Sequence, residues 1–500
     1  MRRGRLILPA LLVVSGVGLL MYPLNAHSAP RYALTGAIWD DQSLAIDGYP
    51  LGLDKAVVEG QTFSDKAPGQ PLWALPAYGI YRTLGGQPAR TPQGEGNLGL
   101  WLVTLWSATL PAAALVSLMV FVSRDVDERS AVLAGLFTWG GTLLLPFSAA
   151  LFGHVLAALL LFASFVALRK GRAGPAWPFV GGVLAGFAAV TEYSASLGVA
   201  VLATWLLVAQ RPKIFHFVAG GLSPLLILAL YNVFAFGSPF TISYQLNAFH
   251  GIADNVRPLF HMFASPSADN FLQLFFGPRG FLMATPIVFV GLLGHFRLIR
   301  SGLARDLGGV GMAMFAVFTA LPVFWANPWG GDSPGPRYMI PAFAFLAPGV
   351  AVALRELPKL TIGTGILSFL TMGLATLTNP FVAGPQDAGG VGAWIELARE
   401  GGWAPSLMGL PQTVVAVLVI AGVSLSMTLD QDRLPLLWRR ARSSANRFSG
   451  GRPSARQLVS SRRRFESDVA KRDVIGGGMT HTTAEELAVE HDWNNDRTSL

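Results

Sequence analysis

Residues 99–122 read GLWLVTLWSATLPAAALVSLMVFV, an apolar run without a charged side chain. As a helix rising about 1.5 Å per residue, the run is long enough to cross a bilayer core about 30 Å thick. Similar runs recur along the 500-residue chain, which is 52% hydrophobic and only 13% charged. Soluble domains carry about 25% charged residues. We therefore predict an all-α polytopic membrane protein, because a transmembrane β-barrel would show short alternating segments instead of continuous apolar runs.

An apolar run from Leu6 to Leu24 follows three arginines and predicts the first span. Ala26-His27-Ser28 resembles a small-residue cleavage site, so a signal peptide competes with the uncleaved signal anchor that we favour. Together the runs predict a bundle of about twelve transmembrane helices in one domain, residues 1–430. Besides the first, the predicted spans cover residues 99–122, 131–149, 152–168, 178–192, 194–209, 215–235, 281–296, 308–325, 338–354, 361–378 and 412–428.

Charge in the loops predicts the orientation of the chain. With the N-terminus in the cytoplasm, the short loops on that side carry an excess of Arg and Lys, whereas acidic residues predominate in the long loops on the other side. We therefore expect a multi-pass protein of the plasma (inner) membrane with both termini in the cytoplasm. The first extracytoplasmic loop, at about residues 25–97, is long, so the active site is expected on the extracytoplasmic face.

The C-terminal part of the chain, residues 431–500, has no apolar span and is rich in arginine. It predicts a basic, mostly disordered cytoplasmic tail that lies near anionic membrane lipids. Because the net charge of +8 is concentrated there, it does not indicate a nucleic-acid-binding protein. The chain has no cysteine, which excludes disulfides, thiolate nucleophiles and Cys-ligated metal sites.

Within the first loop, Ser64-Asp65-Lys66-Ala67-Pro68-Gly69-Gln70 places a carboxylate beside an ammonium group just before a Pro-Gly turn. An aromatic amphipathic run follows at residues 72–81 and suits the lipid–water boundary. A cation fixed at that boundary could hold the phosphate of a lipid. The alternative is an ordinary turn with a surface ion pair that contributes at most about 1 kcal/mol.

Other polar residues are predicted to lie near the same membrane face, where charge is costly and tends to mark function. Each has a structural alternative: a histidine that caps a helix, a carboxylate that pairs with a neighbouring helix, an arginine that reaches to headgroups, or a solvated acidic surface. With the Asp65–Lys66 pair, the candidate site residues are Arg31, Asp40, Asp41, Asp47, His154, Glu192, Tyr244, Arg279, Arg337 and Tyr338.

This pattern fits a transfer reaction on a lipid-phosphate-linked sugar. Arginine and lysine would hold the phosphate and stabilise the charge that develops on it as the sugar leaves. A carboxylate would take the proton from the acceptor hydroxyl, and such general-base assistance contributes about 10²–10⁴-fold. The sequence has neither a P-loop nor a G-x-G-x-x-G after a predicted strand, so no nucleotide site is indicated.

Four stretches, in this order, resemble a known family: residues 63–69, 231–239, 277–280 and 329–338. The chain resembles the GT-C superfamily of polyprenyl-phosphate-sugar glycosyltransferases over roughly residues 5–430. It is most similar to bacterial family 39-like proteins, which are related to protein O-mannosyltransferases and the lipid A aminoarabinose transferase. The resemblance implies a GT-C-like bundle, a polyprenyl-phosphate sugar donor and a glycan, lipid or protein acceptor. It implies no certain cofactor and leaves room for a divalent metal ion.

The resemblance also implies roles for single residues. The Lys66 segment is similar to a family motif that binds the lipid phosphate, and Pro30-Arg31-Tyr32 looks like the end of an Asp-Glu-Pro-Arg-Tyr motif. Lys66, Arg31, Arg279 and Arg337 would then contact phosphate. Ser28 and Ala29 stand where the family has its acidic pair, so the expected catalytic aspartate is absent from its usual place.

Three aspartates later in the loop are the candidate catalytic bases: Asp47, Asp41 and Asp40. Asp47 is favoured because Ile46 and Gly48 suggest a less solvated setting than the Asp40-Asp41 pair has. Two other functions stay open. A non-catalytic GT-C-like protein would explain Ser28 and Ala29, and a lipid or solute transporter would require polar groups in the middle of several spans.

Overall fold

The computed structural model describes residues 4–52, 54–91, 97–247, 265–325, 328–381, 389–407 and 414. These residues all belong to the first of two compact units, Met1–Leu437. The predicted basic tail, residues 431–500, lies outside the described residues, and so does the predicted span 412–428 apart from Val414.

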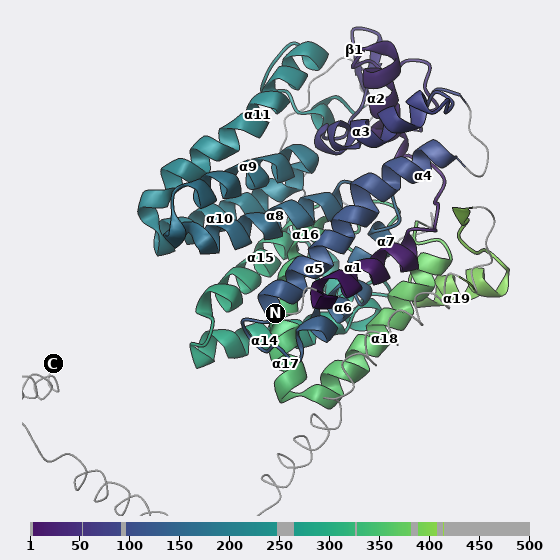
Figure 1. The fold of residues 1–500 in the computed structure, drawn as a ribbon. Coiled ribbons are helices and arrows are strands. Elements are labelled where there is room, and N and C mark those ends of the chain that lie inside the picture. Colours follow the sequence, from purple (N-terminus) through teal and green to yellow (C-terminus); the bar gives the residue numbers. More distant parts are fainter. Residues whose placement is uncertain are drawn as a thin grey trace, which may run out of the picture. The chain divides into compact units, whose positions relative to one another are not determined.

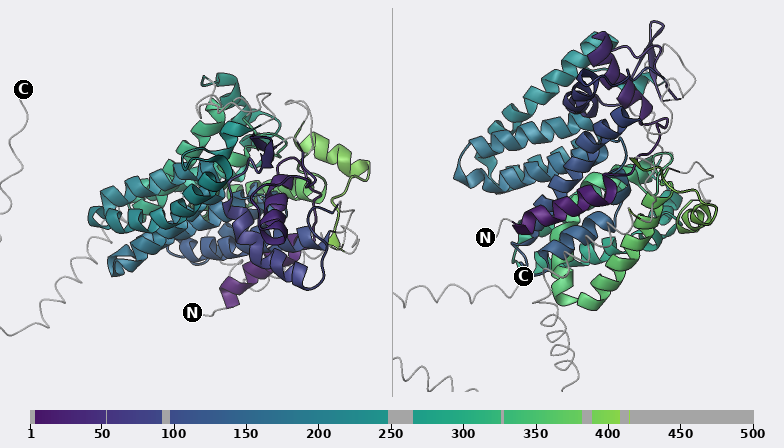
Figure 2. Two further views of the ribbon diagram at one scale, coloured as in Figure 1. Left: turned by 90° about the horizontal axis from the view of Figure 1, so that it is seen from above. Right: turned by 45° about the vertical axis from the view of Figure 1, so that its right-hand side comes forward.

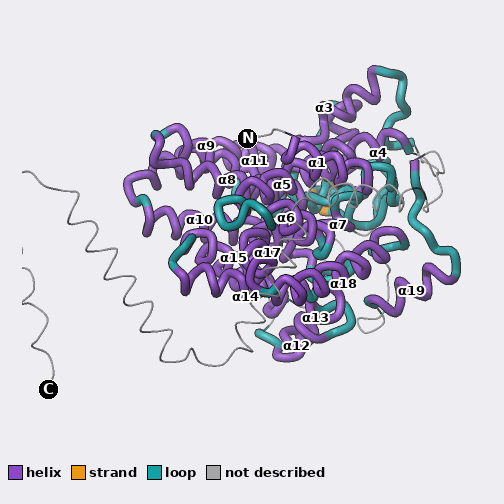
Figure 3. The backbone as a smooth tube through the Cα atoms, turned by 60° about the horizontal axis from the view of Figure 1, so that its bottom comes forward, coloured by secondary structure: helices purple, strands orange, loops and turns teal. Residues whose placement is uncertain are grey.

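The described N-terminal region consists of short helices and one β-hairpin. Figure 3 shows how little strand accompanies the helices. The elements are α1 (Gly4–Val17), α2 (Ala29–Gly36), β1 (Ala56–Val58), β2 (Gln61–Phe63) and α3 (Gly69–Thr83), with a π-helical turn, η1 (Ala37–Asp41), after α2.

The next region is built from apolar helices. The π-helical turn η2 (Leu105–Thr109) joins its first two helices into one continuous span, Leu98–Ser123. The helices are α4 (Leu98–Thr104), α5 (Leu110–Ser123), α6 (Ala131–Gly140), α7 (Leu144–Phe147), α8 (His154–Arg169), α9 (Ala176–Thr191), α10 (Ser196–Ala209) and α11 (Ile214–Phe236).

A third set of helices completes the described chain. Short 3₁₀ turns link several of them, among them η6 (Ser243–Leu246) and η9 (Arg337–Met339). The helices are α12 (Ala268–Phe276), α13 (Phe281–Ala284), α14 (Ile287–Ser301), α15 (Arg305–Phe324), α16 (Ile340–Phe343), α17 (Ala347–Glu356), α18 (Pro358–Leu377) and α19 (Val391–Arg399).

Every predicted span within the described residues overlaps a helix, so the prediction of a helical membrane protein is confirmed. By length and apolar composition, five described helices can cross a membrane, or six if the bent pair Ala268–Ala284 and Ile287–Ser301 is one span. That pair bends by 95°. Four shorter apolar helices of 10–17 residues accompany them. The count of about twelve spans stays a prediction.

Glycines let several of these helices approach closely. A Cβ at Gly182 of α9 would lie 1.9 Å from the carbonyl oxygen of Phe217 in α11, and one at Gly220 would lie 2.0 Å from that of Phe179. A glycine also lets α14 and α17 pack closely, because a Cβ at Gly294 would lie 1.9 Å from the Gly349 carbonyl oxygen. Backbone contact of this kind is typical of membrane helices, which gain stability mainly from close packing.

The first loop folds at one end of these helices. Figure 1 shows α2, α3 and the β1–β2 hairpin gathered beside the end of α11, and the rings of Phe63 and Phe236 pack edge to face at 5.7 Å. These elements share a small hydrophobic core with α4 and α11, and this core includes the fully buried side chains of Tyr32 and Tyr78. The helix α1 packs against α5, as Figure 2 shows in its right-hand view. The loop is therefore a folded cap and not an open linker.

Candidate functional site

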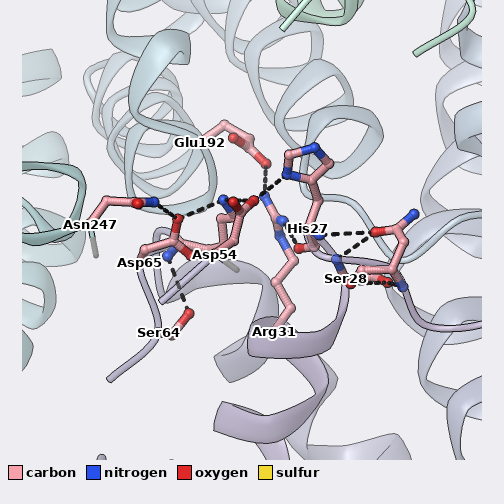
Figure 4. Close-up of polar contacts among 10 residues, drawn as sticks. His27, Ser28, Arg31, Asp54, Ser64, Asp65, Glu192 and Asn247 are labelled. Atoms are coloured by element: carbon pink, nitrogen blue, oxygen red, sulfur yellow. Dashed lines mark hydrogen bonds and ion pairs between the residues drawn. The ribbon is translucent and has the colours of Figure 1, made fainter. Parts of the chain in front are cut away.

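A tight turn before α2 positions the first two polar side chains of the site. The Asn25 side-chain oxygen accepts hydrogen bonds from the backbone N–H groups of His27 (3.0 Å) and Ser28 (2.9 Å), and Ser28 Oγ accepts one from the Asn25 N–H (2.9 Å). Pro30 then lies in the first turn of α2, where the fixed backbone angle of proline suits a helix. Ser28 thus has a structural role here: it fixes the turn from which His27 and Arg31 project (Figure 4).

Arg31 is buried and reaches across to a different helix. Its Nη1 donates to the His27 carbonyl oxygen (2.6 Å), and its Nη2 donates to Glu192 Oε1 (2.7 Å), where α9 ends. Glu192 is also buried, and its second oxygen lies 3.8 Å from His154 Nδ1 at the start of α8. Residues 161 positions apart in sequence are therefore joined by a buried ion pair (Figure 4).

The β-hairpin brings the next pair of charges together. Glu59 and Gly60 form its two-residue turn, both with positive φ (50° and 80°), and Ala56 pairs with Phe63. Two-residue turns with positive φ match the twist of paired strands. If the register is continued past the ladder, Asp54 lies opposite Asp65, next to Lys66. The turn thus explains why an aspartate early in the loop meets the Asp65-Lys66 pair.

Lys66 is the centre of this group and is only 4% exposed. Its Nζ donates to Asp54 Oδ2 and to Asp65 Oδ2, both at 2.7 Å, and lies 5.4 Å from the centre of the Tyr244 ring. Asp65 is fully buried and also accepts a hydrogen bond from Asn247 Nδ2 (2.7 Å). Two carboxylates and an aromatic face therefore hold the ammonium group in place.

Arg337 approaches from the opposite end of the sequence. Its guanidinium lies 5.7 Å from the centre of the Phe152 ring and 5.5 Å from that of Tyr338. Arg31 lies over the same Phe152 ring at 5.5 Å. Arg337 is 6% exposed, yet its Nε and Nη1 have no hydrogen-bond partner among the described residues. A buried guanidinium with unfilled donors is costly in a folded protein, which makes Arg337 the strongest candidate for a ligand contact.

Burial and neighbouring charges set the protonation of the loop groups. Burial raises the pKa of Asp65. Burial lowers the pKa of His27 to about 3, and the positive charges of Arg337 and Lys66 add to this effect. The pKa of Asp54 would rise through burial, but its contacts with His27 and Lys66 hold it well below its usual range. His27 is therefore neutral and Asp54 ionised near pH 7.

A cavity of about 590 Å³ opens beside this charged group. Its walls are mostly apolar and come from α9, α10, α11 and α15, with Leu197 and Leu225 among them. Glu192, Tyr244 and Tyr338 also line it. The cavity therefore has an apolar body and reaches the buried charges at one side.

Most predicted site residues come together in one place. We define the buried charge cluster as His27, Arg31, Asp54, Asp65, Lys66, His154, Glu192 and Arg337, with Tyr244 and Tyr338 at its edge. Arg279 lies apart from it: its Nη1 donates to the Ser333 carbonyl oxygen (3.2 Å), four residues before Arg337. A Cβ at Gly389 would collide with its guanidinium, so Arg279 is packed between two loops.

The three aspartates predicted as catalytic bases have other partners. Asp40 accepts hydrogen bonds from Tyr78 and Arg82, and Asp41 accepts them from Tyr49 and Arg90. Asp47 accepts one from the backbone N–H of Thr62 (3.0 Å). Their role as bases stays a prediction. The expectation that Asp47 has the least solvated setting is wrong, because Asp47 is exposed whereas Asp40 is half-buried.

Two members of the cluster, His27 and Asp54, were not among the predicted site residues. His27 stood only in a possible cleavage site, and Asp54 was one of many charges in the loop. A usable signal was present: Val57-Val58-Glu59-Gly60-Gln61-Thr62-Phe63 has the alternation and the central turn of a hairpin. Recognising it would have placed Asp54 across from Asp65.

A divalent metal ion is held by several His, Asp or Glu side chains that meet at one point. Within residues 4–407, apart from the gaps given above, no group of three or more His, Asp or Glu side chains is arranged to hold a metal ion. Lys66 occupies the space between the two loop carboxylates, Asp54 and Asp65. The divalent metal ion for which the resemblance leaves room therefore has no ligand set among the described residues.

Comparison with known proteins gives matches by structure alone. No family model matches the sequence, and no curated protein matches it. ArnT from Cupriavidus metallidurans bound to undecaprenyl phosphate is similar, with a TM-score of 0.51, 16% identity, and coverage of 88% of this chain and 73% of ArnT. The same protein in the apo state has a TM-score of 0.50 and 16% identity, with coverage of 85% of this chain and 74% of ArnT. A third match is the archaeal oligosaccharyltransferase AglB from Archaeoglobus fulgidus, in complex with an inhibitory peptide and a dolichol-phosphate. It has a TM-score of 0.45 and 13% identity, with coverage of 81% of this chain and 56% of AglB.

The two ArnT structures match most of the chain, 88% and 85% of its residues. The identity is low, so the likeness concerns the arrangement of helices and not the chemistry. The resemblance inferred from the four short motifs is confirmed at the level of the fold: the chain is a membrane protein whose fold is similar to that of ArnT.

Proposed function

We propose that this protein is a membrane glycosyltransferase that moves a sugar from a polyprenyl-phosphate donor to an acceptor at the extracytoplasmic face of the plasma membrane. The observation that carries the proposal is a single arrangement: an apolar cavity of about 590 Å³ whose polar side is formed by Glu192, Tyr244 and Tyr338. These residues contact the buried cations Arg31, Lys66 and Arg337, and both arginines have unfilled donors. A lipid that ends in a phosphate has both the apolar chain and the anion that such a place requires.

The cations would share the work of holding the phosphate. Arg31 and Lys66 already have carboxylate partners, so they supply fixed positive charge close to the site. Arg337 has two N–H groups left for a phosphate oxygen. Hydrogen bonds between charged groups are about twice as strong as neutral ones, and a water-poor setting strengthens them. In this proposal Arg279 supports the loop of Arg337 and is at most an outer phosphate contact.

The apolar part of the donor would enter the cavity between α10, α11 and α15. Leu197, Leu225 and Leu228 line that space, and Glu192, Tyr244 and Tyr338 lie at its polar side. Ligand sites of this kind are mostly apolar with a few polar groups that fix orientation. The solved ArnT structure with undecaprenyl phosphate supports this class of lipid, because the two chains share the fold.

The chemical step requires stabilisation of the phosphate as a leaving group. When the bond between the sugar and the phosphate oxygen breaks, negative charge grows on that oxygen. Preorganised donors aimed at developing charge are worth about 10²–10³-fold each. Arg337 and Lys66 are the best candidates for these donors, because the positive charges of both lie close enough to His27 to lower its pKa. Asp40, Asp41 and Asp47 remain candidate bases for the acceptor hydroxyl, together with the residue discussed below.

Two measurements on the purified full-length protein in detergent test this proposal. In the first, binding of undecaprenyl phosphate is compared with binding of inorganic phosphate and of phosphatidylglycerol. We expect tight binding of undecaprenyl phosphate alone, since it has both the chain and the terminal phosphate. In the second, undecaprenyl phosphate carrying a radiolabelled hexose or pentose is supplied, and release of the sugar to acceptors or water is followed.

Lys66→Ala should abolish most binding and transfer. Lys359→Ala is the matched control, because Lys359 is exposed on α18. Equal behaviour of Lys66→Ala and Lys359→Ala in both assays would exclude the proposed site. Normal binding of the lipid phosphate without any transfer would instead favour the non-catalytic alternative. Binding of all three ligands with similar affinity would show that the cavity does not select a lipid phosphate.

A further inference from the structure

We propose that His27, oriented by Asp54, is the general base that takes the proton from the acceptor hydroxyl during sugar transfer. The inference rests on the proposed function, and it assigns the catalytic base to a residue type that the family motif does not have at this place. Its starting point is the turn at Asn25–Ser28, which puts an imidazole next to the positions where the sequence lacks the expected acidic pair.

Asp54 determines which ring nitrogen of His27 is free to act. His27 Nδ1 is in direct contact with Asp54 Oδ2 (Figure 4). The negative charge of Asp54 beside Nδ1 favours the tautomer that carries its proton on that nitrogen. Nε2 is then the nitrogen with the lone pair. Asp54 is held in turn by Lys66, which keeps the imidazole plane in one orientation. Asp54 is thus a positioning residue.

The free nitrogen lies beside the proposed phosphate contact. A Cβ built on Gly331 would be 2.9 Å from His27 Nε2 and 3.8 Å from Arg337 Nη1. Gly331 has a φ of +104°, a conformation that other residues rarely adopt. The chain therefore has a glycine at a place where a side chain would stand between the imidazole and the guanidinium. The space that it leaves open is bounded by a base on one side and an unfilled cation on the other.

The surrounding charges explain how this base would respond to the donor. The groups that face His27 are Asp54, Lys66 and Arg337, and Arg31 donates to its carbonyl oxygen. Without donor, burial and the two cations keep the pKa of His27 low. A phosphate bound to Arg337 and Lys66 would offset their positive charge and raise that pKa. The base would thus become stronger when the donor is in place, which limits wasteful reaction.

The aspartates 40, 41 and 47 lack this relation to the cations. Asp40 and Asp41 are paired with Arg82 and Arg90, and Asp47 accepts the Thr62 N–H on an exposed part of the loop. No described contact joins any of the three to Lys66 or Arg337. The His27–Asp54 pair, in contrast, lies beside both Lys66 and Arg337.

The step balances as follows. The acceptor oxygen forms a bond to the anomeric carbon of the sugar while the bond from that carbon to the phosphate oxygen breaks. The electron pair of the broken bond stays on the phosphate, which leaves as polyprenyl phosphate. The acceptor proton moves to His27 Nε2, and the resulting imidazolium is stabilised by Asp54. The proton then passes to the departing phosphate or to water, and the imidazole is neutral again.

The first test uses His27→Gln and His27→Ala in the full-length protein, with His216→Gln as the matched control because His216 is exposed on α11. We expect undecaprenyl phosphate binding to change by less than about threefold, and kcat for sugar transfer to fall by about 10²–10⁴-fold, the usual contribution of a general base. Added imidazole should restore part of the activity of His27→Ala and none of that lost in Lys66→Ala. A kcat within about threefold of wild type in His27→Gln would overturn the inference.

The second test does not depend on turnover. The imidazole signals of the eight histidines are followed by NMR as a function of pH, and the His27 signal is identified by its loss in His27→Gln. We expect undecaprenyl phosphate to raise the protonation midpoint of His27 by at least one pH unit, and inorganic phosphate to have a smaller effect. Saturating lipid without a shift would overturn the inference. Absence of lipid binding in wild type would overturn the proposed function itself, which separates the two failures.

Discussion

Two groups of charged residues, one within the first loop and one that joins the loop to the helices, use the same residue types in opposite ways. The buried charge cluster contains Arg31, Lys66 and Arg337 with three carboxylates. A second group, which we call the outer clasp, consists of Asp40 with Arg82 and Tyr78, and Asp41 with Arg90 and Tyr49. Both groups join acids to bases. They differ in burial and in whether buried donors are left without a hydrogen-bond partner.

In the outer clasp, both aspartates already have partners within the loop. Each aspartate has one arginine and one tyrosine hydroxyl as partners, and Arg90 is about half exposed. Exposed pairs of this kind contribute little to stability. The cluster has removed its charges from water and still leaves Arg337 Nε and Nη1 unfilled. Buried charges with unfilled hydrogen-bond donors cost stability, so they indicate a ligand site. Solvated ion pairs whose carboxylates already have partners indicate a structural contact.

The largest expected effect concerns the Arg31–Glu192 pair. Glu192→Ala leaves a buried guanidinium without its carboxylate, and loss of one partner of a buried pair costs about 3–5 kcal/mol. A thermal unfolding assay in detergent should show a large drop in the midpoint. Asp40→Asn in the outer clasp should show a much smaller one. Equal drops for the two variants would break the distinction between the two regions.

The next effect should separate binding from stability. Arg337→Leu removes the guanidinium that has unfilled donors. Hydrogen bonds to a charged group are worth about 1.5–3 kcal/mol, so undecaprenyl phosphate should bind about 10–150-fold more weakly. The thermal midpoint should stay the same or rise, because an uncompensated buried charge is lost. A lower midpoint together with unchanged binding would mean that Arg337 serves the fold and not a ligand.

A third prediction concerns how the loop is seated on the helices. Gly69 begins α3 three residues after Lys66, and a Cβ there would lie 2.7 Å from the backbone of Thr191, next to Glu192. Gly69→Ala should therefore push Lys66 away from the end of α9, at a cost of about 1–3 kcal/mol for an overpacked contact. Lipid phosphate binding should weaken with it.

Gly309→Ala in α15 is the control for that variant, because a Cβ at Gly309 meets nothing within 4 Å. It should leave binding unchanged and stabilise the helix slightly, since alanine is the better helix former. If Gly69→Ala behaves like Gly309→Ala, the loop is not held against α9 in the way described here.

The smallest effect is expected in the outer clasp. Arg82→Gln removes one partner of Asp40 and leaves the Tyr78 hydroxyl in place. The pair is partly exposed, so the loss of stability should stay below about 1 kcal/mol. Undecaprenyl phosphate binding should change by less than about twofold in the binding assay described above. A tenfold loss of binding would show that the outer clasp belongs to the site, and it would support Asp40 as the catalytic base.

Reasoning from the sequence was accurate where the signal is local. The continuous run at residues 99–122 corresponds to the described span Leu98–Ser123, because apolar length and composition alone decide whether a helix prefers a membrane. The Asp65-Lys66 neighbours were identified for the same reason, since their charges are adjacent in the chain. The reading of Asp47 failed because the flanking Ile46 says nothing about how far the Asp47 side chain projects into water.

The sequence by itself determined that this chain forms apolar membrane helices and carries a charged first loop, because hydropathy and charge belong to single residues and short runs. Only the tertiary structure decided which charges lose their water. The Arg31–Glu192 pair, the contact of His27 with Asp54 and the unfilled donors of Arg337 each depend on segments that are distant in the chain. The energy of a charge depends on its burial and its partners, and both are properties of the folded chain.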